Sequence, residues 1–402
     1  GKPVVVLSNN DGCVVARSAE AKRLGVKAGT PFYQLRQLFP NVRIEALSSN
    51  YELYGEITGR VMTIIRDMAP QCFRYSIDEA FAVLDGFSVE QLKEWGEELH
   101  RRVLQSVGMP LTIGIAPTKT LAKMASHFAK KYAGYNHCCV IDTDDRRLKA
   151  AALYPIDEVW GIGRRYAARL ESYGIRTAYD FAAHSRSWVR ATFKTVVVER
   201  TWAELNGTDC VPDDLPAKKK SICTSRSFSG MVCDFDTLRS HVANFAARCA
   251  GKLRPQQSAA SIVGVFVESN RFRPDLTQYC NMTEANLSTP SSSTIDVVKA
   301  ATACLQRIYR EDIHYKRAGV VLMGVVPNAA VQADLFTFDV EKHQHMMQLD
   351  SAVDRINKVD GTETVILSSQ QYPNGRKFAD AIKHDLKSAC PTTRWSDIIK
   401  LK

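Results

Sequence analysis

Two adjacent carboxylates, Asp78 and Glu79, stand inside the otherwise apolar stretch FRYSIDEAFAVLDG at residues 73–86. The alternation of apolar residues on either side predicts two short, half-buried strands closed by a turn. Burying one carboxylate there costs several kcal/mol unless something compensates, and two neighbouring carboxylates also repel each other. Two interpretations follow: a tight hairpin whose acidic tip is solvated, or a site for a divalent cation whose charge offsets the repulsion.

Lysines recur along a predicted helix, TKTLAKMASHFAKKYA, at residues 118–133. Spaced lysines most often form a solvated helix face. This helix, however, follows the apolar strand LTIGIA, which we expect to pair near the acidic hairpin. Ammonium groups close to two metal-bound carboxylates suit a triphosphate, because they help to neutralise its charge as phosphoryl transfer proceeds. The lysines concerned are Lys119, Lys123, Lys130 and Lys131.

The sequence WGIG, followed by RRYAARLESYGI, is typical of a helix-hairpin-helix. Gly161 and Gly163 allow a tight turn at which backbone N–H groups meet a phosphate at a helix N-terminus. Arg164, Arg165 and Arg169 add positive charge on the same side. The alternative is an ordinary pair of helices that needs glycine only for its turn. The motif predicts sequence-independent, salt-sensitive contacts with a phosphate backbone.

The whole chain is basic, with a formal net charge of +10 and a pI near 9.0. This balance indicates a polyanionic partner, although basic surfaces also serve solubility. The segment SNNDGCVVARSAEAKRLGVK contributes Arg17, Lys22 and Arg23, which on their own would count as surface charge. The length of 402 residues is sufficient for two to four domains.

Several classes of protein are disfavoured by what the sequence lacks. Its 11 cysteines contain no CxxC pair, so neither a zinc site nor a thioredoxin-like motif is supported, and buried thiols in a reducing cytosol fit better. We find no apolar run of membrane-spanning length, no signal peptide and no GxxxxGK[ST] loop of helicases or nucleoside kinases. The opening GKPVVVLS lacks methionine and begins almost on a strand, which suggests a fragment.

The elements that must position these residues fall into segments. Residues 51–143 alternate helices and strands, which predicts a sheet with helices packed on it. Residues 150–210 are predicted to be helical, and VPDDLPAKKKS at 211–221 has the proline and charge of a linker. Beyond the linker we expect strands and helices in the order βαββαβ, the ferredoxin-like arrangement. After Pro327 the pattern weakens into a tail with one helix near HMMQLDSAVDRINK.

The motifs, in this order, resemble one family closely. They are SNNDGCVVARSAEAKRLGVKAGTP, SSNYELY, YSIDEAF, GIAPTKTLAKMASHFAKK, VWGIGRR and SRSF. Together they are similar to the Y-family translesion DNA polymerases, and most of all to the UmuC-type catalytic subunits of bacterial DNA polymerase V and its plasmid-borne relatives. The resemblance covers essentially the whole chain, including the tail PTTRWSDIIKLK.

The resemblance implies a multidomain α/β and α+β fold, the right hand of a polymerase. The expected parts are fingers at 1–50 without the N-terminal palm strand, a palm at 51–143, a helix-hairpin-helix thumb at 144–210, a linker at 211–220, a βαββαβ little finger at 221–327, and a clamp-binding motif with a C-terminal tail at 328–402.

The resemblance also implies roles for individual residues. Asp78 and Glu79 become palm carboxylates that hold two Mg²⁺ ions for nucleotidyl transfer. Basic residues expected to bind the triphosphate of the incoming deoxynucleotide are Lys22, Arg17 and Lys130. Residues expected to contact primer-template DNA are Lys119, Lys123, Gly161, Gly163, Arg164, Arg165 and, in the strand SRSF, Arg226. For Arg226 the alternative is pairing with an acidic neighbour. Fingers positions that contact phosphate or base in some relatives are Ala16 and Ala19 here.

The implied function is error-prone DNA-directed synthesis past lesions in the SOS response, in the bacterial cytoplasm and at the nucleoid during repair. The family's first metal-binding aspartate and its aromatic gate against ribonucleotides would lie on a strand before GKPVVV, so we expect a truncated chain. The alternative is a non-catalytic DNA- and clamp-binding protein that keeps the polymerase fold.

The segment VQADLFTF fits the QxxLF peptide that docks on the sliding clamp. Leu335 and Phe336 offer apolar anchors for a groove, and Gln332 can hydrogen-bond at its rim. A Leu-Phe pair more often packs on its own domain. Here Pro327 breaks the preceding strand, so we expect exposure. The family further implies a processed UmuD-type dimer and a RecA filament as partners, and no membrane.

Overall fold

The computed structural model describes residues 1–69, 71–213, 218–328, 340–361, 364–372 and 384–398. Contacts divide the chain into two compact units, Gly1–Ser49 with Ala217–Lys387 and Asn50–Pro216 with Ser388–Lys402. No helix within the described ranges is long and apolar enough to cross a membrane. The six-part division expected from the sequence stays a prediction.

The N-terminal part of the first unit is a three-stranded sheet in the order β2-β1-β3, with β1 antiparallel to β2 and parallel to β3. Short helices pack beside it around a small apolar core that includes Val5, Leu7 and Leu35. Gly25, at φ +85°, follows the C-terminal end of the first helix. The elements are β1 (Val4–Leu7), β2 (Val14–Arg17), α1 (Ala19–Arg23), α2 (Phe32–Leu38) and β3 (Glu45–Ser48).

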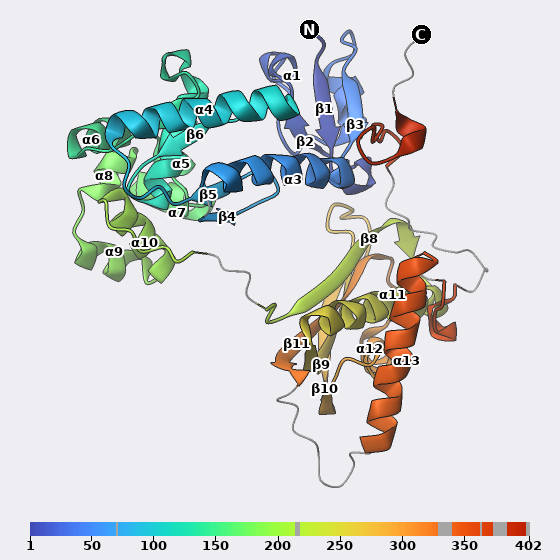
Figure 1. Cartoon of the computed structure of the whole chain (residues 1–402). Coiled ribbons are helices and arrows are strands. Elements are labelled where there is room, and N and C mark those ends of the chain that lie inside the picture. The colour runs from blue at the N-terminus through green and yellow to red at the C-terminus, as the bar shows by residue number, and fades with distance from the viewer. Residues whose placement is uncertain (70, 214–217, 329–339, 362–363, 373–383, 399–402) are drawn as a thin grey trace. The chain divides into compact units, whose positions relative to one another are not determined.

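The first unit also contains a four-stranded antiparallel sheet, β10-β9-β11-β8, with two helices packed on one face (Figure 1). Inward side chains recur at every second position, as Val263, Val265 and Val267 show with no exposed surface. The chain order confirms the predicted βαββαβ arrangement. The elements are β8 (Ile222–Val232), α11 (Phe235–Leu253), β9 (Ser258–Ser269), β10 (Cys280–Ser291), α12 (Thr294–Ile308) and β11 (Tyr315–Pro327).

Polar contacts attach the following chain to this four-stranded domain. Helix α13 (Val340–Val359) carries Asp354, whose two carboxylate oxygens each accept a hydrogen bond from Arg254 at the end of α11. Further on, the Tyr372 hydroxyl lies 3.0 Å from Nδ1 of the buried His241, and the Gln370 carbonyl accepts from the Asn244 amide at 2.8 Å.

The second unit begins with two small two-stranded pairs and three long helices. Strands β4 and β5 form an antiparallel hairpin, and β6 and β7 pair in parallel. Their core includes Met62, Leu99, Val103 and Ile113. The elements are α3 (Tyr51–Met68), β4 (Cys72–Arg74), β5 (Ala80–Ala82), α4 (Val89–Val107), β6 (Ile113–Ile115), α5 (Lys119–Lys131) and β7 (Cys138–Val140).

The remainder of the second unit is helical, as predicted for residues 150–210. Val159, Ile162, Leu170 and Ile175, the packing positions of the helix-hairpin-helix motif, are all buried in one cluster with α5. The helices are α6 (Asp144–Leu153), α7 (Arg164–Ser172), α8 (Ala178–Ala182), α9 (Arg186–Phe193) and α10 (Val196–Leu205).

Candidate functional site: an acidic hairpin in a lysine-lined cleft

The two adjacent carboxylates lie at the tip of the β4–β5 hairpin. Phe73 is paired with Phe81 across the strands, and the backbone N–H groups of Tyr75 and Ser76 both donate to the Glu79 carbonyl at 3.0 Å, which closes the turn. The predicted hairpin is therefore confirmed. Asp78 and Glu79 are both exposed, so they carry no burial cost, and the case for a cation depends on what surrounds them.

The acidic tip opens into a cleft of about 850 Å³, a volume typical of ligand sites. Its walls come from α3, the hairpin, α4, β6 and α5. Asp78, Glu79, Lys119, Lys123 and Lys130 all line it. The structure thus brings five of the residues selected from the sequence into one cavity, although they are up to 52 positions apart in the chain, from 78 to 130.

Lys123 holds the carboxylate of Glu79. Its Nζ lies 2.7 Å from Glu79 Oε1 and 4.5 Å from the centre of the Tyr75 ring. Asp78 is bound differently, because its Oδ1 accepts a hydrogen bond of 2.6 Å from the Ser76 hydroxyl. Within the described residues, no three His, Cys, Asp or Glu side chains lie close enough to hold one metal ion. The hairpin therefore offers a pair of oxygen ligands, one of them already neutralised by an ammonium group.

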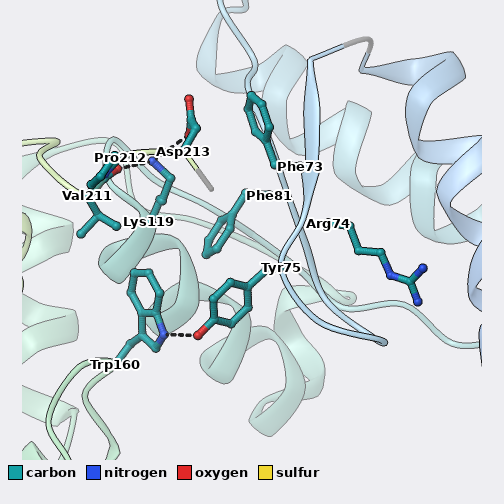
Figure 2. Close-up of a pocket in the computed structure, with 9 residues that line it drawn as sticks. All are labelled: Phe73, Arg74, Tyr75, Phe81, Lys119, Trp160, Val211, Pro212 and Asp213. Atoms are coloured by element: carbon teal, nitrogen blue, oxygen red, sulfur yellow. Dashed lines mark hydrogen bonds and ion pairs between the residues drawn. The ribbon is translucent and has the colours of Figure 1, made fainter. Parts of the chain in front are cut away.

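Lys119 is occupied within its own unit. Its Nζ donates to the Val211 carbonyl at 2.7 Å and lies 3.0 Å from Asp213 Oδ1, and its side chain is only 16% exposed (Figure 2). It thereby fastens the segment after α10 to the start of α5. Burial raises the pKa of the neighbouring Asp209 above its ordinary value. Lys130, at the last turn of α5, is instead exposed to the cleft. Contact of Lys119 with DNA stays a prediction.

The WGIG turn has the glycine geometry expected of it. Gly161 has φ +91°, and an added Cβ would lie 2.2 Å from Thr201 Oγ1, so both conformation and space require glycine there. Gly163 is the N-cap residue of α7 and supplies no side-chain cap. Arg164 and Arg165 are exposed beside these N–H groups and make no ion pair within the described residues. The turn is open to an anion.

Trp160 is a residue of this site that the sequence alone did not single out. Figure 2 shows its indole N–H donating to the Tyr75 hydroxyl, at 3.0 Å, from the segment just before the WGIG glycines. Phe81 completes a cluster of three rings. The only sequence signal was a tryptophan next to a glycine turn, which does not reveal its partner 85 positions away.

Family models match three parts of the chain. Residues 1–127 match the impB/mucB/samB family, residues 219–335 match the C-terminal domain of that family, and residues 347–401 match a domain of unknown function, DUF4113. Protein UmuC of Salmonella typhimurium is 38% identical, over 100% of this chain and 94% of the relative. This chain belongs to the impB/mucB/samB family. Its resemblance to UmuC-type Y-family polymerases is confirmed.

More distant relatives agree with this assignment. DNA polymerase IV of Dehalococcoides mccartyi is 26% identical over 90% of both chains. Among solved structures, a Y-family DNA polymerase chimera of Dbh and Dpo4 has a TM-score of 0.62 at 22% identity, covering 82% of this chain and 93% of that one. At that identity the likeness shows the fold, and it confirms the expected polymerase fold class.

Two basic residues expected at the triphosphate belong to the first unit. Arg17 Nη1 donates to the Val26 carbonyl at 3.1 Å, and Lys22 is exposed on α1. Their role at the triphosphate stays a prediction. In this impB/mucB/samB chain the expected clamp residues Gln332, Leu335 and Phe336 lie outside the described residues.

Arg226 lies on the face of β8 that the helices cover. It is paired in register with Ala318, which has no exposed surface, and it is itself half-buried. The open face of the sheet carries Arg317 instead, whose guanidinium is 5.3 Å from the centre of the Phe266 ring. DNA contact by Arg226 stays a prediction. The alternation of Ile222 and Phe228 with exposed residues was the signal that could have located this face.

Proposed function

We propose that this chain is an error-prone DNA-directed DNA polymerase that copies damaged templates in the SOS response, by two-metal-ion nucleotidyl transfer from deoxynucleoside triphosphates to primer-template DNA. The observation that carries the proposal is the convergence of Asp78, Glu79, Lys123 and Lys130 on one cleft of about 850 Å³. Membership in a family of UmuC-type proteins supports it, as does similarity to a relative named DNA polymerase IV.

The residues at the hairpin tip fit Mg²⁺. Asp78 and Glu79 supply carboxylate oxygens, the hard ligands this ion prefers, and both are exposed to the cleft. When bound, two Mg²⁺ ions would lower the pKa of the primer 3′-hydroxyl and neutralise the leaving pyrophosphate. Asp78 and Glu79 would hold them, and Lys123 would have to share Glu79 with them.

The remaining residues act on the substrates. Lys130 faces the cleft with an exposed ammonium group and would bind the triphosphate, so that negative charge is met where it develops. The WGIG turn, with Arg164 and Arg165 beside it, would bind the DNA backbone by N–H donation and charge. Neither contact reads base identity, which suits a polymerase that accepts damaged templates.

Primer extension past an abasic site with Mg²⁺ tests the proposal. Asp78→Asn and Glu79→Gln should each lower the extension rate by at least about 100-fold, because each removes a charge from the reaction centre. Asp144→Asn with Asp145→Asn is the matched control, since these two neighbouring carboxylates pair with Arg147 and Lys149 at the start of α6. Unchanged extension by the hairpin variants would refute the assignment.

A second candidate is a non-catalytic DNA- and clamp-binding protein. It is favoured by the ion pair between Lys123 and Glu79 and by the lack of a third metal-ligating side chain among the described residues. Wild-type protein that binds primer-template DNA but extends no primer with either Mg²⁺ or Mn²⁺ would establish this alternative.

The partners are proposed from resemblance alone. Gln332, Leu335 and Phe336 would dock on the sliding clamp, and a processed UmuD-type dimer and a RecA filament would engage the C-terminal tail, in the cytoplasm and at the nucleoid during repair. Replacing Leu335 and Phe336 with alanine should abolish clamp capture in a pull-down while distributive extension on short primers continues. Retained clamp affinity would contradict the motif assignment.

A further inference from the structure

Three aromatic rings connect the acidic hairpin to the WGIG turn. The ring centres of Tyr75 and Phe81 are 5.6 Å apart, those of Tyr75 and Trp160 also 5.6 Å, and those of Phe81 and Trp160 5.8 Å. The indole N–H of Trp160 donates to the Tyr75 hydroxyl at 3.0 Å (Figure 2). Tyr75 and Phe81 belong to the hairpin, whereas Trp160 comes directly before the glycine turn, so the cluster joins two functional segments.

The ammonium group of Lys123 lies against all three rings. Its Nζ is 4.5 Å from the Tyr75 ring centre, 5.8 Å from that of Phe81 and 5.9 Å from that of Trp160. These distances are within the range of cation–π attraction. The same Nζ is 2.7 Å from Glu79 Oε1, and the Lys123 side chain is only 21% exposed. The three rings therefore hold the Lys123 ammonium group in place, and that group in turn holds the Glu79 carboxylate.

Trp160 is also tied to the turn that follows it. The Thr201 hydroxyl donates to the Trp160 carbonyl at 3.3 Å, and the Ile162 N–H donates to the Val159 carbonyl at 2.9 Å. Gly161 has no room for a side chain against Thr201. Because the backbone on both sides of Trp160 is held in this way, a displacement of the turn displaces the indole ring with it.

We propose that Trp160 is a positioning residue that couples phosphate binding at the WGIG turn to cation binding by Asp78 and Glu79. A phosphate held at the turn fixes the indole, and the indole fixes Tyr75 and the hairpin strand. The hairpin tip then loses less conformational freedom when it binds a cation. Coupling between two sites is reciprocal, so a bound cation also strengthens phosphate binding. The proposal rests on the proposed function for the two ligands that are coupled.

Equilibrium titration with Mn²⁺, with and without a primer-template duplex and without nucleotide, measures the coupling. In the wild-type chain the duplex should tighten Mn²⁺ binding by roughly 3- to 10-fold, the effect expected from one hydrogen bond and its ring contacts. Trp160→Phe and Tyr75→Phe should each bring the ratio of the Mn²⁺ affinities with and without duplex close to one. The double variant should add nothing further, because both remove the same bond.

Trp202→Phe is the matched control. Trp202 also lies in the helical part of the second unit, and its indole N–H donates to the His184 carbonyl at 2.9 Å. Among the described residues, no hydrogen bond or ring contact joins its side chain to the hairpin or to the WGIG turn. Trp202→Phe should leave the ratio of the Mn²⁺ affinities with and without duplex at the wild-type value. An equal loss of coupling in Trp202→Phe would show a general structural effect and overturn the proposal, as would a wild-type ratio of one.

Fluorine NMR of the 5-fluorotryptophan-labelled chain gives a readout independent of activity. Among its five tryptophans, the Trp160 resonance, assigned by its loss in Trp160→Phe, should shift when Mg²⁺ is added, and Glu79→Gln should abolish the shift.

If Glu79→Gln leaves Mn²⁺ affinity unchanged, the proposed metal site is wrong. If Glu79→Gln abolishes extension while Trp160→Phe keeps full coupling, the proposed function stands and this inference fails. Should Trp160→Phe fold poorly, Tyr75→Phe, which removes only a hydroxyl, decides.

Discussion

The four-stranded domain and the hairpin segment (Cys72–Lys131) are built in opposite ways. Strands β8 to β11 are 11 to 13 residues long and cover one continuous apolar core. Strands β4 to β6 have three residues each, and the side chains of the site are placed by single contacts. In the four-stranded domain, the alternation of apolar residues along each strand determines which side chains face the core. In the hairpin segment, the placement of a side chain depends on residues far away in the chain.

The two regions also differ in what their contacts contribute to stability. Burial of apolar surface stabilises the four-stranded domain by about 25 cal/mol per Å². The partly exposed ion pair of Lys123 and Glu79 stabilises the hairpin by about 1 kcal/mol at most. We conclude that changes in the domain should act mainly on folding, whereas changes in the hairpin segment should act mainly on function.

The largest expected effect is in the four-stranded core. Phe245 of α11 is 1% exposed and packs in the largest cluster of the first unit. Phe245→Ala should lower the free energy of unfolding of this domain by about 3–5 kcal/mol, because the cavity it leaves cannot fully collapse. Guanidinium denaturation followed by circular dichroism measures the change.

Phe81→Ala supplies the comparison. It removes a half-buried ring from the aromatic cluster and should lower stability by only about 1 kcal/mol. Primer extension should nevertheless fall, because Lys123 loses part of its support. Equal destabilisation by the two alanine variants would break the contrast between the regions.

A second test asks whether the four-stranded domain is held by apolar packing alone. Arg254 is 17% exposed and bonds Asp354 of α13 through two nitrogens, so Arg254→Ala should loosen α13 by about 2 kcal/mol. Amide hydrogen exchange should speed up in α13 and stay slow in β9. Arg239→Ala is the control, because among the described residues Arg239 forms its ion pair within α11, with Asp236. Faster exchange throughout the sheet would mean that the Arg254–Asp354 contact stabilises the four-stranded core as well as α13.

The contrast explains how far the sequence could be interpreted. The βαββαβ order was predictable because alternating apolar residues, such as those of β9, must face one core. The hairpin was predictable from its alternation and turn. The contact of Trp160 with Tyr75 was not, because no local pattern links positions 85 apart. Arg226 was selected for its charge, while its face followed from the register of β8 with β11.

A third test concerns the start of α3, which polar contacts attach to the C-terminal segment 388–398. Asn50 is fully buried, caps α3 through Leu53 N–H, and donates to the Ser388 carbonyl at 3.1 Å. Asn50→Ala should lower stability by about 1 kcal/mol and release the segment 388–398. Asn50→Ser keeps a capping oxygen, so it should release the segment while α3 keeps its stability. Limited proteolysis and hydrogen exchange distinguish the two. Protection of the tail in both variants would contradict this anchor.

The smallest effect compares two buried thiols, one in the four-stranded domain and one in β7, which pairs with β6 of the hairpin segment. Burial raises the pKa of both Cys138, in β7 beside the hairpin, and Cys249, in α11, to about 11. At pH 8 the folded protein therefore holds either thiolate about 100-fold less populated than a thiol with a pKa near 9. Because opening two three-residue strands requires less free energy than opening the four-stranded core, alkylation should reach Cys138 faster than Cys249.

The pH dependence follows from the two pKa values. Neither thiol is exposed in the folded protein, so iodoacetamide reaches each one through an opened state. When opening and closing are fast compared with alkylation, the rate should rise tenfold per pH unit up to about pH 11, the pKa of the folded thiol, because above pH 9 the opened thiol is deprotonated while the folded thiol is not, and opening becomes easier. Mass spectrometry of iodoacetamide-treated protein, with the exposed Cys223 as the fast reference, gives both rates. We expect this tenfold rise for both thiols, with Cys138 reacting faster than Cys249 at every pH. Equal rates for the two thiols would mean that one opening exposes both of them, and that the strands beside the hairpin are as firmly held as the four-stranded core.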